Sequence, residues 1–382
     1  MRKAIWGSLS LMTASMLCIA YIPQSNSAWW SLVALVVWTI SYFLLMHEGK
    51  HLAADDEMER NKNIRYIIYG GIIMRMLLLF AFPRWASDLY RILWDAKLQA
   101  IGYNPYSVTP KELMDRGLNT FSNAGNIYHQ LRDVHAYTTN GPLYEWIAFI
   151  AVKLSLGKDW VMTSIFRLII IMLDILSILT LLKWQQNAKI KLSSLLHYLF
   201  NPFIVFSIAM FAPAWTLAFA LLIFSYQLMQ QNRMLRSGIL YVLALAASPL
   251  SLFALPILWM KASRKTIIKS SIVIVLLGIS AYLPYFRTGD VRHNIVAEWM
   301  HDLLYYPGGG ILQGFSFINP IYPAIGLGLA ILAWLFFYSR NLYRQRKEEI
   351  ETIALGAFEA SMTWAYFLPI AVIIAWLLEV MV

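Results

Sequence analysis

The sequence predicts an all-α polytopic membrane protein with about 10–11 transmembrane helices. Three observations support this prediction. Of its 382 residues, 59% are hydrophobic and only 14% are charged, whereas soluble domains carry roughly 25% charged residues. Several apolar runs approach or exceed the roughly 20 residues that span a bilayer. The net charge of +10 gathers in short loops between these runs. That distribution indicates membrane orientation and contact with anionic lipid, and excludes nucleic-acid binding.

The apolar runs define the expected helices in chain order. The first follows Arg2 and Lys3 and is interpreted as a span, because no clear small-x-small cleavage site of a signal peptide follows it. The single cysteine, Cys18, lies in this run and excludes an internal disulfide and a cysteine metal cluster. The runs lie at 4–21, 28–47, 64–82, 141–156, 161–182, 192–210, 213–231, 238–260, 266–285, 312–338 and 353–380.

Basic loops set the expected direction of the spans. The loop 48–63 and the runs 261–265 and 340–347 are basic and are expected inside. Residues 1–382 are then a single integral domain of the cell membrane. Segment 83–140 forms a large extracytoplasmic loop with an amphipathic interfacial helix, and 286–311 forms a second extracytoplasmic loop.

Segment 141–156 leaves two topologies open. If it spans, the lysines at 183–191 and the arginines at 233–236 face outside, against the positive-inside rule. If it is re-entrant or interfacial, both loops move inside, and 238–260 must be a broken pair with its break at Ser248-Pro249. The shortness of 141–156 and the presence of Glu145 favour the second topology.

Segment 83–106 carries the most informative pattern. On a helix, Asp88, Arg91 and Asp95 fall at i, i+3 and i+7 and share one face, while Leu89 and Ile92 belong to the opposite face. This pattern is typical of a helix in the membrane interface, with its apolar side down and its carboxylates facing water. The turn residues of GYNPY at 102–106 are expected to end it, and Asn140-Gly141-Pro142-Leu143 forms a second turn.

Asp88 is the candidate general base. It would take a proton from an acceptor hydroxyl as that oxygen attacks an activated sugar carbon, and partial desolvation at a membrane surface would raise its basicity. Asp95 would orient the acceptor or balance Arg91. The alternative is a solvated ion-pair ladder of Asp88, Arg91 and Asp95 that only holds the helix.

Charges expected inside the membrane form a second candidate group. Arg75 and Arg167 would each lie roughly 10 Å below the outer surface, where charge is costly. Because a guanidinium binds phosphate bidentately, both are candidates for holding a lipid phosphate. The alternative is internal pairing, with Asp174 at i+7 from Arg167 as the expected partner.

The second outer loop adds polar candidates. Arg292 and His301 are expected to stabilise a departing phosphate, against the alternative of an ordinary polar loop. The spacing of His293, His301 and Asp302 matches no zinc pattern, so no metal site is predicted.

One block of the chain resembles a known family. The stretch SDLYRILWDAKLQAIGYNPY at 87–106 resembles the outer-loop signature of GT-C superfamily membrane glycosyltransferases, and more narrowly that of bacterial polyprenyl-phosphate-mannose-type mannosyltransferases. Asn140–Leu143 and Asn201-Pro202 resemble later elements of the same enzymes. The chain departs from the pattern at Leu89, where the family carries a second acidic residue, and at Ala96, where it carries glycine. The matching residues are Ser87, Asp88, Tyr90, Arg91, Trp94, Asp95, Gly102, Asn104, Pro105 and Tyr106.

The resemblance implies an inverting glycosyltransferase with its active site on the extracytoplasmic side. It would move a mannose-like hexose from a polyprenyl-phosphate carrier to an envelope glycan or lipid, with Asp88 as base. The carrier is the donor substrate; no cofactor and no tightly bound metal are implied. The partners are membrane lipid, the lipid-linked sugar and the acceptor. The expected substrate-binding residues are Tyr90, Arg91, Trp94, Asp95, Asn104 and Tyr106, and the expected phosphate-binding residues are Arg75, Arg167, Arg292 and His301.

Two rival interpretations remain open. A non-enzymatic flippase for lipid-linked sugars, or a scaffold of an envelope polysaccharide assembly system, also suits charged intramembrane residues and a broken helix. An acyl- or phosphoryltransferase is disfavoured, since it would be expected to show a His-Asp pair or a metal cluster in the outer loop.

Overall fold

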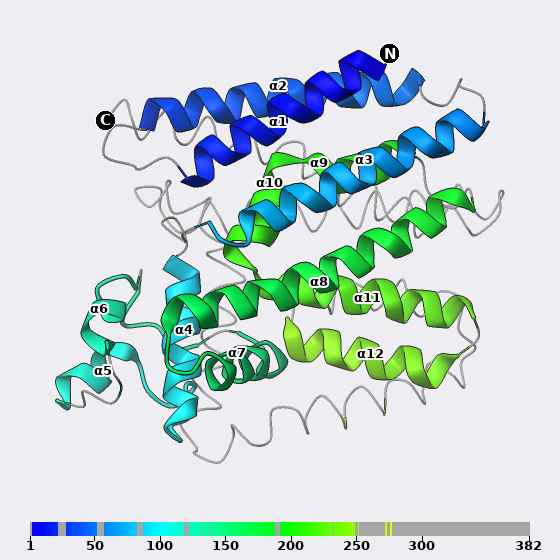
Figure 1. Cartoon of the computed structure of the whole chain (residues 1–382). Coiled ribbons are helices and arrows are strands. Elements are labelled where there is room, and N and C mark those ends of the chain that lie inside the picture. The colour runs from blue at the N-terminus through cyan, green and yellow to red at the C-terminus, as the bar shows by residue number, and fades with distance from the viewer. Residues whose placement is uncertain are drawn as a thin grey trace, which may run out of the picture.

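Long helices arranged side by side form the body of the protein in the computed structural model (Figure 1). Every element in the described part of the chain is a helix, which confirms the all-α prediction for these residues. The structure describes residues 2–21, 28–51, 57–81, 87–117, 121, 123–131, 133–138, 140–187, 192–231, 233–248, 251, 272 and 276. The helices are α1 Arg2–Tyr21, α2 Ala28–His51, α3 Glu57–Leu78, α4 Ser87–Ala100, α5 Pro110–Asp115, α6 Ala124–Tyr128, α7 Pro142–Leu154, α8 Asp159–Gln186, α9 Leu192–Phe200, α10 Pro202–Phe206, the π-helix η3 Ser207–Phe211, α11 Ala214–Gln230 and α12 Met234–Ala247.

Helix α8 joins two hydrophobic cores. Ile171 near its middle and Ile178 in its second half pack into a cluster with α1, α2, α3 and α9. Phe166 and Ile170 in its first half pack into a second cluster with α4, α7, α11 and α12. Because α8 contributes to both clusters, it fixes the N-terminal helices relative to the segment that carries the 87–106 block.

Helix α4 lies across one end of the bundle rather than along it (Figure 1). It packs against α7 and against the start of α8, and the short helices α5 and α6 lie at the same end. The apolar residues at i, i+3, i+4 and i+7 explain this placement, since Leu89, Ile92, Leu93 and Ala96 are all buried. The block at 87–106 therefore sits at an end of the helix bundle.

The predicted apolar runs and the observed helices agree in order over the described chain. Helices α1, α2, α7, α8 and α11 match the expected ranges within a few residues, and 192–210 is divided into α9, α10 and η3. Helix α3 begins before the predicted run 64–82 and ends at Leu78, and α12 covers only the first part of 238–260. Helix α12 ends at Ala247 and Ser248 is extended, so the helix stops where the break was predicted. Apart from Ile272 and Leu276, the predicted runs 266–285, 312–338 and 353–380 and the loop 286–311 lie outside the described residues.

Among the described residues, one helix is long and apolar enough to cross a membrane by itself. This helix is α8, with 28 residues and a mean hydropathy of 2.5 over its most apolar window. The bent pair Leu192–Phe200 and Ile204–Phe211, with an angle of 52° between its halves, would be a second candidate if it counts as one broken span.

Arg75 stabilises the break between α9 and α10. Pro202 has no N–H, so the carbonyl of Tyr198 lacks its helical donor. The Arg75 guanidinium donates to the carbonyl oxygens of Tyr198 at 3.0 Å and of Leu199 at 2.8 Å. Its Nε forms a buried ion pair with Asp174, which also accepts a hydrogen bond from the Tyr198 hydroxyl. This network joins α3, α8 and α9 in the interior.

Gly141 allows α7 to approach the end of α12. A Cβ atom at this position would lie 2.6 Å from the Ala247 carbonyl oxygen and would also collide with the Ala246 carbonyl oxygen. We expect Gly141→Ala to lower the free energy of unfolding by about 1–3 kcal/mol, because backbone has to move. Gly238→Ala is the matched control: its Cβ meets open space, and it should raise stability by about 0.5–1 kcal/mol. Equal thermal midpoints for the two variants would contradict the close packing.

Candidate functional site

Helix α4 is closed at its C-terminus by a glycine-based cap. Gly102 has φ +91° and donates to the Gln99 carbonyl oxygen, while Tyr103 donates to the Leu98 carbonyl oxygen. These two bonds are those of a Schellman motif, which needs a left-handed residue at this place. The Asn104 side chain then accepts a hydrogen bond from the Tyr106 backbone at 3.0 Å. The prediction that GYNPY ends the helix is confirmed.

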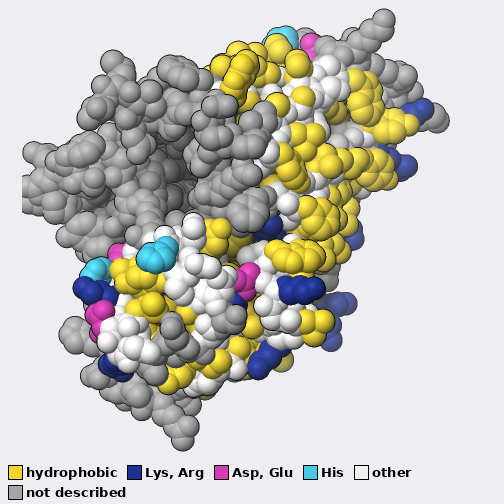
Figure 2. All heavy atoms as spheres, turned by 60° about the vertical axis from the view of Figure 1, so that its left-hand side comes forward, with side chains coloured by type: hydrophobic (Ala, Val, Ile, Leu, Met, Phe, Trp, Pro, Cys, Tyr) yellow, Lys and Arg dark blue, Asp and Glu magenta, His cyan; other side chains and the backbone are white. Residues whose placement is uncertain are grey.

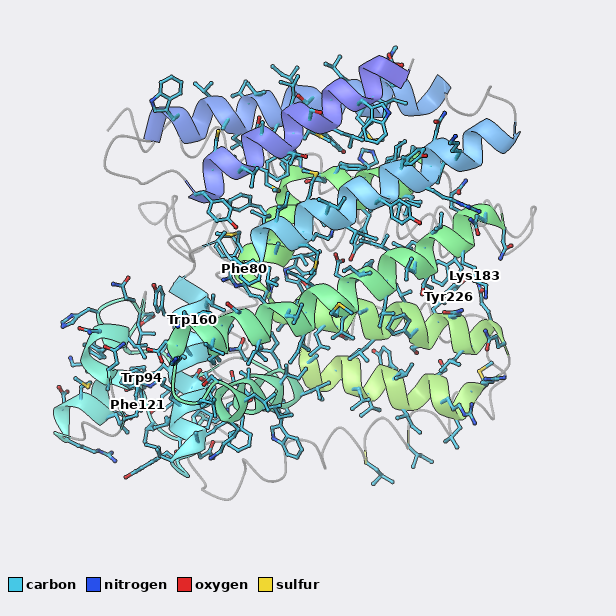
Figure 3. The ribbon with its side chains drawn as sticks, in the orientation of Figure 1. Phe80, Trp94, Phe121, Trp160, Lys183 and Tyr226 are labelled. Atoms are coloured by element: carbon cyan, nitrogen blue, oxygen red, sulfur yellow. The ribbon has the colours of Figure 1, made fainter. Side chains whose placement is uncertain are left out.

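Trp94 fixes α4 to the rest of the outer segment. Its side chain is buried and meets the ring of Phe121 edge-on at 5.0 Å between centroids (Figure 3), with Tyr128 at 6.2 Å. Tyr90 is half-buried and packs on the same core as Trp94. The aromatic pair at i, i+4 therefore contributes to packing within the protein.

Arg91 and Asp95 form the centre of a buried polar network. The Arg91 Nε contacts both Asp95 carboxylate oxygens, at 2.9 and 3.1 Å. The Arg91 terminal nitrogens donate to the Ala136 carbonyl oxygen at 2.8 Å and to the Thr138 hydroxyl at 3.0 Å. Thr138 in turn donates to Asp95. The predicted balance between Arg91 and Asp95 is confirmed as an ion pair.

The prediction that the carboxylates of this helix face water is wrong for Asp95. Its side chain is 1% exposed, because residues 136–138 cover the charged face of α4. Burial raises the pKa of Asp95, and the Arg91 charge and the Thr138 hydrogen bond oppose this rise. The covering segment is more than 40 positions away in the chain, so helical periodicity did not reveal it.

Glu145 was not among the predicted site residues, and it extends this network to α7. It lies in the first turn of α7 and is fully buried. Its carboxyl group accepts hydrogen bonds from the Gln99 side chain and the Asn140 side chain, each at 2.9 Å. Tyr106 donates to the Asn140 backbone carbonyl oxygen at 2.6 Å. The signal in the sequence was a carboxylate inside an otherwise apolar run.

The two buried carboxyl groups share a single cation. Burial, followed by the neighbouring Asp95 charge, raises the pKa of Glu145 well above its usual value, and the hydrogen bonds and the Arg91 charge only partly oppose this. Burying a second negative charge beside one guanidinium is costly. The network therefore shifts the titration of its carboxyl groups toward the protonated form.

The two interior arginines are both held by helix ends. Arg75 donates four hydrogen bonds, to Asp174 and to the carbonyl oxygens of Gly71, Tyr198 and Leu199, so internal pairing accounts for it. The spacing predicted a pair between Arg167 and Asp174, and this prediction is wrong because the two side chains do not pair. Arg167 donates to the Ala81 carbonyl oxygen at 2.8 Å, just beyond the end of α3, and its buried Nε has no hydrogen-bond partner among the described residues.

The structure describes the other predicted catalytic and phosphate-binding residues only in part. Asp88 is the second residue of α4, three positions before Arg91. Arg292 and His301 lie outside the described residues. Of the six predicted substrate-binding residues, Arg91, Trp94, Asp95, Asn104 and Tyr106 contact other parts of the protein, and contact with a substrate stays a prediction for each.

Comparison with known proteins gives no relative. No family model matches the chain, no curated protein matches it, and no solved structure matches it.

Proposed function

We propose that the protein is a polytopic membrane protein. The two faces of α8 support this: Leu168, Met172, Leu176 and Leu179 are exposed. Arg167, Asp174 and Ser177 are buried on the same helix. Apolar residues outside and charged residues inside suit a lipid surrounding better than water. Figure 2 shows hydrophobic side chains over a broad part of the described surface, with Lys and Arg mainly at its edges.

The positions of charged and aromatic residues at the two ends of the helix bundle favour the topology in which segment 141–156 does not cross the membrane. Lys183 lies at the end of the bundle opposite Trp94 and Trp160 (Figure 3), and the α11–α12 connection lies at the Lys183 end. Helix α7 has 13 residues, or about 20 Å, less than the roughly 30 Å hydrocarbon core. With basic loops inside, the α4–α7 end faces the extracytoplasmic side.

Labelling of single cysteines tests this orientation. In a Cys18→Ser background, we expect Asp115→Cys to react with a membrane-impermeant maleimide on intact cells, because Asp115 is exposed at the α4–α7 end. Arg233→Cys, exposed between α11 and α12, should react only after the cells are permeabilised. Reaction of both residues on intact cells would exclude the proposed topology.

We infer further that the protein is an inverting glycosyltransferase that uses a polyprenyl-phosphate sugar. The observation that carries this inference is the position of α4, which bears Asp88 in its first turn and is held across the end of the bundle by other residues of the same sequence block. A helix at the membrane surface suits a substrate that combines a lipid with a sugar. The rigid attachment of α4 suits a base that has to keep its place.

In the proposed reaction, Asp88 takes the proton of an acceptor hydroxyl as its oxygen attacks the anomeric carbon from the side opposite the phosphate. The bond from the anomeric carbon to the phosphate oxygen breaks, and polyprenyl phosphate leaves. Cations lower the barrier by meeting the charge that grows on the phosphate. The proposed cations are Arg167, whose buried Nε has no hydrogen-bond partner in the described part of the chain, Arg292 and His301. Arg75 is not one of them, because it is engaged with Asp174 and three carbonyl oxygens.

A transfer assay tests the reaction class. Purified protein in nanodiscs is incubated with a panel of radiolabelled polyprenyl-phosphate hexoses, mannose included, and a membrane extract as acceptor. We expect label from one donor to appear in a new, larger product. Binding of the donors with no transfer from any of them would refute the glycosyltransferase proposal.

The broken helix favours a second candidate function, the flipping of a lipid-linked sugar. The chain bends by 52° between α9 and the following helical segment, and discontinuous helices form substrate sites in transporters. The discriminating measurement is movement of a fluorescent lipid-linked sugar across a proteoliposome without any change in its chemical structure. Such movement, with no product in the transfer assay, would favour the flippase.

A further inference from the structure

One buried carboxyl group bridges α4 and α7, in addition to the apolar core that the two helices share. Glu145 is 0% exposed, and its two oxygens accept hydrogen bonds from Gln99 on α4 and from Asn140 just before α7. Asn140 is itself held by the Tyr106 hydroxyl. Glu145 therefore joins the far end of the helix that carries Asp88 to the core of the bundle.

No cation in the described structure bonds to Glu145. The nearest guanidinium, that of Arg91, is engaged with Asp95 at 2.9 Å, with the Ala136 carbonyl oxygen and with Thr138. An ionised Glu145 would place a second negative charge next to Asp95 inside the protein, where a carboxylate without a counter-ion is expensive. The neutral acid forms the same contacts if one amide side chain turns its oxygen toward the carboxyl proton.

The other elements around Glu145 bring no compensating charge among the described residues. Helix α8 meets α7 through Phe166, which packs on Tyr144. The end of α12 presents the backbone of Ala246 and Ala247 to Gly141. Asp159, at the start of α8, is paired with Lys97. The charged groups that act on Glu145 are thus Asp95 and Arg91 alone.

We propose that Glu145 is a positioning residue that carries a proton at neutral pH and, as a neutral acid, locks α4 across the end of the bundle. Its role in catalysis rests on the proposed function, since the lock fixes the helix that bears Asp88. The lock itself is a property of the resting protein and does not depend on the reaction.

Protonation gives the lock a definite pH dependence. Because the pKa of Glu145 is raised in the folded protein, the stability that this group contributes is complete below its unfolded value and is lost as pH rises through its folded value. Glu145→Gln resembles the neutral acid at every pH. We therefore expect Glu145→Gln to be at least as stable as wild type at neutral pH, and its thermal midpoint to rise further above that of wild type as the pH increases toward the folded pKa of Glu145.

Thermal unfolding in detergent between pH 6 and pH 9 tests the proposal on wild type, Glu145→Gln and Glu145→Ala. Asp115→Asn, which changes an exposed carboxylate of the same outer segment, is the control and should follow wild type throughout. We expect Glu145→Gln to match or exceed wild type at each pH and Glu145→Ala to unfold at a lower temperature. A Glu145→Gln midpoint below wild type at pH 7, with a gap that widens as pH rises, would show that the carboxylate is charged and overturn the proposal. An unchanged Glu145→Ala midpoint would also overturn it.

Hydrogen exchange localises the effect. At pH 8 we expect the amides of 87–100 to exchange several-fold faster in Glu145→Ala than in Glu145→Gln, while those of α1 and α2 stay equal. Comparison at one pH removes the intrinsic pH dependence of exchange. Equal exchange of 87–100 in the two variants would contradict the lock. Since neither measurement uses a sugar donor, failure of the lock and failure of the transferase proposal are separate results.

Discussion

Replacing Asp88 by asparagine is expected to reduce sugar transfer by a factor of about 10²–10⁴, the range in which general bases contribute. Asparagine keeps the shape of the side chain and removes its ability to accept the proton of the acceptor hydroxyl. Asp88 lies at the start of α4, and the substitution leaves both residues of the Arg91–Asp95 pair that holds the helix in place. The variant should therefore insert and bind the donor like wild type. The measurement is the initial rate of label transfer in nanodiscs.

Two companion variants make this result specific. Asp115→Asn removes an exposed carboxylate from the same outer segment and should transfer sugar at the wild-type rate. Asp95→Asn breaks the buried pair with Arg91, so it should lower the thermal midpoint as well as the activity. Near-normal turnover of Asp88→Asn in purified protein would rule out Asp88 as the base.

Replacing Arg75 by methionine is expected to lower the free energy of unfolding by about 3–5 kcal/mol, the usual cost of removing one partner of a buried ion pair. Asp174 would lose its counter-ion in the interior, and the Tyr198 carbonyl, which Pro202 deprives of its helical donor, would lose the guanidinium. Thermal unfolding in detergent or nanodiscs measures the effect.

Arg65→Met provides the matched control on the same helix. Arg65 is exposed on α3, so its replacement should change stability by no more than about 0.5 kcal/mol. Combining Arg75→Met with Asp174→Leu should recover part of the loss, because no unpaired charge remains, although the Tyr198 carbonyl stays without its donor. Equal stability of Arg75→Met and Arg65→Met would mean that the network does not hold the α9–α10 break.

Local features of the fold could be predicted from the sequence because they depend on neighbouring residues. The Gly102 turn that ends α4, the start of α7 at Pro142 and the end of α12 before Ser248 all follow from the conformations that glycine and proline allow. The apolar runs likewise gave the order of the helices, since burial of each run needs only its own composition.

Contacts between distant segments could not be predicted in the same way. Spacing at i+7 placed Arg167 and Asp174 on one face of α8, but it carried no information about α3, whose Arg75 takes Asp174 as its partner. The amphipathic pattern of α4 indicated a polar face. It did not reveal whether that face contacts water or, as the structure shows, the segment 136–138. Glu145 was visible as an unusual residue, but its partners come from two other elements.

The pairing of Arg75 with Asp174 also has a consequence for synthesis of the chain. The two residues are 99 positions apart, so α3 leaves the ribosome well before the carboxylate that neutralises its arginine. An arginine without a counter-ion inside the membrane is poorly accepted by lipid. We therefore expect α3 to wait beside the insertion machinery until α8 arrives, and to enter the bilayer together with it. In truncated chains that stop before Asp174, a single cysteine placed in α3 should remain reactive toward a water-soluble maleimide, whereas the same cysteine in the full-length chain should be protected.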